Sequence, residues 1–114
     1  MKTLHIDTER GWRGGEQQAL YLCGGLLQYG HEAVMACRRN DEMARRASQA
    51  GVPTFEFNPV GEIDPGAVLR LARLIRTGGF DLVHMHTSHA HTLGTLAGML
   101  SPRTALIVSR RVDF

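Results

Sequence analysis

The sequence has little cysteine and no long apolar run. Cys23 and Cys37 are the only two cysteines in 114 residues. Such a pair makes neither a disulfide scaffold nor a metal knuckle, so we expect two buried thiols in a reducing cytoplasm. No apolar stretch approaches the roughly 20 residues that span a bilayer. The opening Met1 to Asp7 is too short and too soon charged for a signal peptide. The sequence therefore predicts a cytoplasmic location.

Charge of one sign is not in excess, and aromatic residues are few. Lys and Arg number 13 against 11 Asp and Glu, and aromatic residues make up 6% of the chain. No aromatic platform accompanies the basic positions, so we expect no nucleic-acid partner. The 43% of hydrophobic residues exclude a disordered chain. A chain of this length holds one domain with one modest core.

Short apolar runs alternate with helical periodicity along the whole chain. Strands are expected at residues 2–7, 32–37, 53–57, 80–86 and 104–109, and helices at 16–29, 41–50, 63–76 and 88–100. This alternation predicts an α/β fold, a Rossmann-like, doubly wound parallel sheet of about five strands. With helices on both faces, each strand should be almost continuously apolar. The chain stops directly after the fifth strand, so we expect a truncated domain whose unfinished sheet edge invites a homodimer or a partner chain.

Ligands of such sheets bind beyond the carboxyl ends of the strands. There we expect a glycine loop, with Gly14, Gly15 and Glu16, between the first strand and the first helix. Backbone N–H groups of glycines at a helix N-terminus suit a phosphate. A turn that requires positive φ is the alternative. The spacing is not the dinucleotide G-x-G-x-x-G pattern, so no nicotinamide cofactor is predicted.

Four histidines lie in the fourth strand and directly after it: His84, His86, His89 and His91. The run resembles the H-x-H-x-D-H zinc motif of metallo-β-lactamase-type hydrolases, but Ser88 stands where that motif has Asp. We therefore predict no metal, and keep a zinc hydrolase with His84, His86 and His89 as an alternative. His84 should pack partly in the sheet. His86, His89 or His91 should face the rim, where a histidine can bind a hydroxyl or act as an acid or base.

Two arginine pairs end strands. Arg110 and Arg111 end the fifth strand and suit a phosphate or an anionic acceptor, with a solvated strand exit as the alternative. Arg38 and Arg39 end the second strand, where a Rossmann enzyme can hold the 2′-phosphate of NADP. Without the glycine pattern that role is not favoured.

A third group of arginines lies on helices. Arg70, Arg73 and Arg76 recur every three residues, and Arg45 and Arg46 precede them. Such a row is typical of a solvated helix face. Peripheral contact with anionic lipid headgroups is the alternative.

Several short motifs together resemble the amino-terminal part of a group 1, family 4 glycosyltransferase of the GT-B fold. They occur in the family's order along the whole chain: Leu4-His5-Ile6-Asp7 with Gly14-Gly15-Glu16-Gln17, then Tyr29 to Ala33, Phe80 to His86, and Ser109 to Phe114. Many members end the fifth strand with a histidine near the reacting sugar. Here Arg110 or Arg111 occupies that neighbourhood.

The resemblance implies a retaining transfer from a nucleotide-sugar donor to a sugar or lipid-linked acceptor, in cell-envelope glycan or lipopolysaccharide synthesis, without a cofactor. Residues 1–114 would be a partial, acceptor-side domain, inactive without the nucleotide-binding carboxy-terminal domain. Gly14 and Gly15 would lie near the donor diphosphate, and His86 or His89 would orient the acceptor hydroxyl. The alternative is a non-catalytic phosphate- or nucleotide-binding subunit that acts with a partner chain.

Overall fold

A computed structural model describes residues 1–10, 12, 14–60, 64–99 and 105–108 of the chain. Strands and helices alternate, in the order β1 (Lys2–Asp7), α1 (Gly14–Gln28), β2 (Glu32–Arg38), α2 (Glu42–Gln49), β3 (Thr54–Phe57), α3 (Pro65–Gly78), β4 (Leu82–Met85), α4 (Ser88–Met99) and β5 (Ala105–Val108). The strands form one parallel sheet in the order β3-β2-β1-β4-β5. The predicted doubly wound sheet of about five strands is confirmed.

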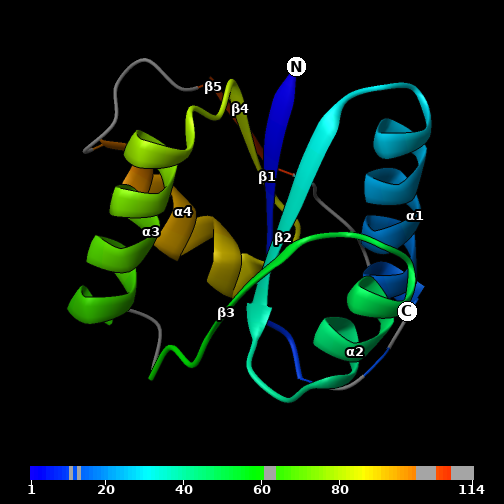
Figure 1. The fold of residues 1–114 in the computed structure, drawn as a ribbon. Coiled ribbons are helices and arrows are strands. Elements are labelled where there is room, and N and C mark those ends of the chain that lie inside the picture. Colours follow the sequence, from blue (N-terminus) through cyan, green and yellow to red (C-terminus); the bar gives the residue numbers. More distant parts are fainter. Residues whose placement is uncertain (11, 13, 61–63, 100–104, 109–114) are drawn as a thin grey trace.

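Two helices cover each face of the sheet. Figure 1 shows α1 and α2 on one face and α3 and α4 on the other. The strand order reverses between β1 and β4, since β2 and β3 lie on one side of that pair and β5 on the other. In open sheets of this kind, ligands bind outside the carboxyl ends of the strands at such a reversal. The fold therefore points to the carboxyl ends of β1 and β4 as the place to look for a site.

The start and end of α3 follow from its terminal residues. The side chain of Asp64 accepts hydrogen bonds from the backbone N–H groups of Gly66 (3.0 Å) and Ala67 (3.2 Å), and Pro65 occupies the first turn. Gly79 ends the helix at a φ of 67°, a conformation that costs glycine least. Within the described residues, no helix combines the length and apolar character that crossing a bilayer requires.

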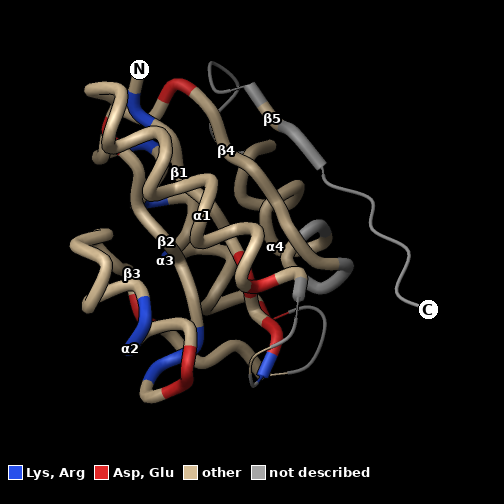
Figure 2. Tube along the Cα trace, turned by 90° about the vertical axis from the view of Figure 1, so that its right-hand side faces the viewer, with Lys and Arg blue, Asp and Glu red and all other residues tan. Residues whose placement is uncertain are grey.

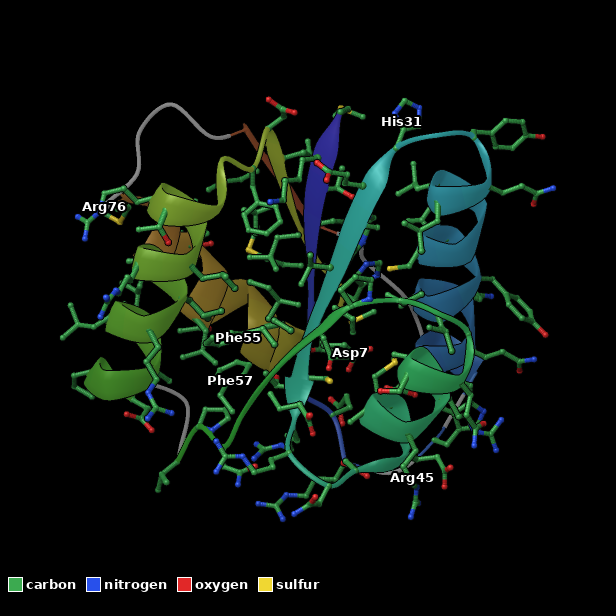
Figure 3. The ribbon with its side chains drawn as sticks, viewed as in Figure 1. Asp7, His31, Arg45, Phe55, Phe57 and Arg76 are labelled. Atoms are coloured by element: carbon green, nitrogen blue, oxygen red, sulfur yellow. The ribbon has the colours of Figure 1, made fainter. Side chains whose placement is uncertain are left out.

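The core consists of two layers, one on each face of the sheet. On one face, Leu4, Ile6 and Met85 pack against α3 and α4, and Phe55 and Phe57 lie between the sheet and α3 (Figure 3). On the other face, a smaller cluster joins β2 to α1 and α2; its members are Ala19, Leu20, Cys23, Ala33, Met35, Cys37, Met43, Ala44, Ala47 and Val52. The apolar layers thus hold the four helices in place.

Both cysteines belong to the smaller cluster, as the sequence predicts. Cys23 and Cys37 are buried and free. Burial raises the pKa of each thiol to about 12. Since the thiolate is the reactive form, neither side chain is suited to nucleophilic chemistry.

The expectation that every strand is almost continuously apolar is wrong for β1. Thr3, His5 and Asp7 alternate with Leu4 and Ile6, and all three polar side chains are buried. They occupy the α1-facing side of the sheet, because their register partners on β2 pack against α1. Buried polar side chains persist only with hydrogen-bonding partners, and the partners of His5 define the site described below.

The larger layer gives a direct test of the packing. We expect Leu71→Ala to lower the free energy of unfolding by about 2–5 kcal/mol, because the fully buried side chain leaves a cavity. Leu69, on the same helix, is 63% exposed, so Leu69→Ala should change that energy by no more than about 0.5 kcal/mol. Urea unfolding of both variants makes the comparison. Equal losses would contradict the assignment of the buried face of α3.

Candidate functional site

The segments after β1 and β4 begin side by side at the carboxyl end of the sheet. The backbone N–H of His86 donates to the carbonyl of Ile6 at 3.0 Å. The hydroxyls of Thr8 and Thr87 lie 3.5 Å apart. The predicted convergence of these two segments on one rim is therefore confirmed.

The N-termini of two helices lie at this rim. Gly14 and Gly15 form the first turn of α1, and Glu16 in the same turn is buried. The prediction that these two glycines lie in a loop is wrong, because both belong to α1. The first N–H groups of a helix have no intrahelical partner. At α4, Thr87 Oγ1 accepts the N–H of Ala90 at 3.1 Å and caps the helix. Both N-termini carry the partial positive charge that favours an anion.

Some of the predicted site residues cannot be placed relative to this rim. His89 lies in the first turn of α4, but its side chain lies outside the described residues, as does that of His91. Arg110 and Arg111 also lie outside the described residues. The geometry of the site therefore rests on the segments after β1 and β4.

His86 follows β4 directly instead of lying within the strand, and its side chain is buried, only 4% exposed, where an open position at the rim was expected. Its Nε2 lies 3.0 Å from Nδ1 of His5, which is fully buried in β1. His84 stacks on His86, with ring centroids 3.9 Å apart and planes at 21°. The ring of His84 is also 5.6 Å from that of His5. Three histidines from two neighbouring strands thus form one cluster.

Sequence reasoning missed His5. The available signal was its place in the first strand, two residues from Thr3 and Asp7 on one face. Its partnership with His84, however, depends on β1 lying beside β4, which pairs these two residues in register. Sequence spacing alone does not give that pairing.

The hydrogen bonds of the cluster can be assigned a direction. Thr3 Oγ1 lies 3.3 Å from the carbonyl of Glu32, which can only accept its single proton. Thr3 Oγ1 also lies 2.9 Å from Nε2 of His5, and with the hydroxyl proton on Glu32 we assign this nitrogen as the donor. A neutral His5 then has a bare Nδ1, which accepts the Nε2–H of His86. The chain of donors runs from His86 through His5 and Thr3 to the backbone of β2. We call it the histidine relay.

Burial keeps His5 neutral. Desolvation, followed by the effect of His84, lowers the pKa of His5 from 6.5 to about 4. At neutral pH, His5 is therefore a fixed acceptor for His86. A proton that enters the cluster should not reside on His5.

The cluster does not fit a metal in this arrangement. The ligand nitrogens of His5, His84 and His86 lie within 4.8 Å of one another, the spacing of a candidate metal site. However, the ring centroids of His5 and His86 are 5.2 Å apart with planes at 26°, so the two bonded nitrogens point at each other. A tetrahedral zinc ion needs the lone pairs of both nitrogens directed at one metal position, off the line that joins the nitrogens and about 2.0 Å from each. Here the two nitrogens are directed at each other, 3.0 Å apart, as in an N–H···N hydrogen bond.

His5 makes the stability of the fold depend on pH. Unfolded His5 takes up a proton near its ordinary pKa of 6.5, but folded His5 only near 4. Between these values the unfolded state binds more protons, so the free energy of unfolding falls as the pH falls. As the pH falls from above 6.5 to below 4, His5 lowers the free energy of unfolding by about 3 kcal/mol. Urea titrations at several pH values should show a shallower decline for His5→Gln.

Leu69→Ala provides the control for this measurement. Leu69 is exposed and carries no titratable group, so its substitution should keep the wild-type slope. A His5→Gln variant with the wild-type slope would contradict a neutral, buried His5.

Comparisons with known proteins agree with this fold. A glycosyltransferase from Rickettsia africae superposes with a TM-score of 0.77 at 15% identity, covering 98% of this chain and 31% of its own. HepE from Anabaena, in complex with UDP-glucose, gives 0.77 at 20% identity, covering 95% of this chain and 28% of its own. MurG from Acinetobacter baumannii gives 0.72 at 15% identity, covering 100% of this chain and 37% of its own. At these identities the likeness concerns the fold, and the chain spans well under half of each structure.

The family is established by sequence. No curated protein matches the chain at a significant level. The sequence model of Glycosyltransferase Family 4 matches residues 12–110, from the segment before α1 to the segment after β5. That match covers most of the sequence; it includes β4, whereas β1 (Lys2–Asp7) precedes it. The chain belongs to Glycosyltransferase Family 4.

Proposed function

We propose that this chain provides the acceptor side of a retaining glycosyltransferase, which moves a sugar from a nucleotide-sugar donor to a sugar or lipid-linked acceptor. Membership of Glycosyltransferase Family 4 supports glycosyl transfer. HepE, which shares the fold, binds UDP-glucose, and this supports a nucleotide-sugar donor. The chain spans 28–37% of the similar structures, so the proposal concerns the whole protein of which such a domain is one part.

The observation that carries the proposal is that His86 and the N-termini of α1 and α4 all follow the carboxyl ends of the neighbouring strands β1 and β4. His86 follows β4 directly, α4 begins two residues later at Ser88, and α1 begins at Gly14 beyond the neighbouring strand. Transfer of a sugar leaves negative charge on the departing diphosphate, which N–H groups at helix N-termini stabilise. Gly14 and Gly15 are the proposed donors toward that charge. Glu16 is proposed to hold the start of α1 in place.

His86 is the proposed group that orients the acceptor hydroxyl. The relay holds its Nε2–H toward His5. This hydrogen bond keeps the ring in one orientation. His89, Arg110 and Arg111 remain proposed contacts of the acceptor or of the donor phosphate. A role in envelope glycan or lipopolysaccharide synthesis, at the inner face of the membrane, is part of the same proposal.

The test is transfer by the complete protein that contains this chain. With a panel of nucleotide sugars, we expect His86→Gln to lower kcat by about 10²–10⁴-fold, the range typical of a positioned acid–base group. His31→Gln, at the far end of the sheet, should retain wild-type kcat. Wild-type transfer that His86→Gln leaves intact would remove His86 from the site. Specific nucleotide binding without transfer by the assembled protein would favour the alternative, a non-catalytic binding subunit.

A further inference from the structure

A second feature of the carboxyl end lies beside the rim, where β2 and β3 end. A pocket of about 600 Å³ opens there. Its polar lining includes Arg10, Arg38, Arg39, Asn40, Asp41 and Asn58. Figure 2 shows basic positions gathered at this end of the molecule near α2, interspersed with acidic ones. We call this feature the arginine pocket.

The arginines of the pocket are incompletely neutralised. Within the described residues, the ion pairs join Glu42 to Arg45 and to Arg46, and none includes an arginine of the pocket. Desolvation and the nearby Arg10 lower the pKa of Arg38, and Asp41 and Glu9 offset this only in part. An additional anion would therefore be attracted to this position.

One oxygen of the Asp41 carboxylate is already engaged. It accepts the backbone N–H of Glu42 at 2.8 Å and caps α2. Capping orients this carboxylate toward the N-terminus of α2, where negative charge is favourable. Asp41 thus caps α2 through one oxygen, while its charge also acts on Arg38 in the same pocket.

Arg38 is held in place before any ligand arrives. Its Nε donates to the carbonyl of Thr8 at 2.6 Å, and its Nη1 donates to the carbonyl of Pro59 at 3.3 Å. A guanidinium has five N–H donors, so these two bonds fix its plane and leave further donors for a ligand. Fixing a side chain in advance reduces the entropy lost on binding.

The backbone beside the arginines is also unusual. Asn40 has a φ of 58°, the only non-glycine residue with positive φ in the described part of the chain. Its N–H donates to the Glu56 carboxylate at 3.4 Å, and the N–H of Arg39 donates to Asn58 Oδ1 at 3.2 Å. Non-glycine residues in this conformation cluster at ligand-binding segments. Here the turn brings Arg38 and Arg39 to the same pocket.

A phosphate suits this lining best. Planar guanidinium groups bind phosphate oxygens in a bidentate manner, and several arginines together match a group of one to two negative charges. The amides of Asn40 and Asn58 can donate to oxygens that the arginines do not reach. A single carboxylate would leave most of these donors unused.

We propose that the arginine pocket binds a phosphate group carried by a small-molecule ligand. Resting on the proposed function, that ligand is the acceptor of the transferred sugar, and the pocket lies at the same carboxyl end of the sheet as His86. The binding itself does not depend on that function. The sequence places Arg38 and Arg39 at the end of the second strand, and the structure shows that Arg10 lines the same pocket.

The test is calorimetric titration of the full chain with inorganic phosphate and with pyrophosphate, without a donor. We expect Arg38→Gln to weaken binding of both probes by roughly tenfold or more, a loss of about 1.4 kcal/mol. Arg39→Gln should also weaken binding. Because Arg39 is exposed and makes no side-chain hydrogen bond in the described structure, its substitution guards against a folding defect in Arg38→Gln. Arg76→Gln removes the same charge at the opposite end of the molecule and should bind as wild type (Figure 3).

Three results would overturn the proposal. The first is the absence of phosphate and pyrophosphate binding by the wild-type chain. The second is an equal loss in Arg38→Gln, Arg39→Gln and Arg76→Gln, since only net charge would then matter. The third is binding to phosphatidylglycerol vesicles that needs Arg38 while the free anions do not bind, which would assign the pocket to a lipid headgroup. Because the titration contains no nucleotide sugar, failure of the transfer assay would not affect the phosphate result. Failure of phosphate binding would likewise leave the proposed transfer activity untouched.

Discussion

The hydrogen bond from His86 to His5 is the constraint on which the carboxyl end of this sheet depends. A fully buried imidazole in a parallel sheet is stable only if both nitrogens are satisfied. Thr3 satisfies one nitrogen and His86 the other. His86 can reach His5 because β4 lies beside β1 and ends level with it. One polar contact therefore ties the two strands together at the point where the strand order reverses.

The two proposed regions at the carboxyl end of the sheet depend on different interactions. Around β1 and β4, a neutral relay fixes the direction of one imidazole, and two helix N-termini supply partial positive charge. Around β2 and β3, full charges on arginines gather in an open pocket, with Arg38 fixed by backbone carbonyls. The first arrangement suits the orientation of a hydroxyl and the stabilisation of charge that develops during reaction. The second suits the capture of a ligand that is charged from the start. Both regions lie at the carboxyl ends of the strands, so one ligand can contact both.

The sequence predicts the fold well because local signals dominate it. The bounds of β1 are correct, and α3 lies within two residues of the predicted 63–76 at each end. The fourth strand is shorter than the predicted 80–86, although Asp81 and His86 still donate backbone hydrogen bonds to β1. The site is less predictable, because it depends on contacts between segments far apart in the chain. His5 gains its role only from the β1–β4 pairing, and Arg38 gains its neighbour Arg10 only from the fold.

The direction of the histidine relay is the central claim, and the nitrogen-15 chemical shifts of the His5 and His86 rings measure it directly. At neutral pH, the account predicts a neutral His5 with its proton on Nε2 and a hydrogen-bonded, unprotonated Nδ1, together with a protonated Nε2 on His86. A proton on Nδ1 of His5 would contradict it. So would a stoichiometric metal ion in protein purified without chelator, because metal binding at these nitrogens would replace the N–H···N bond.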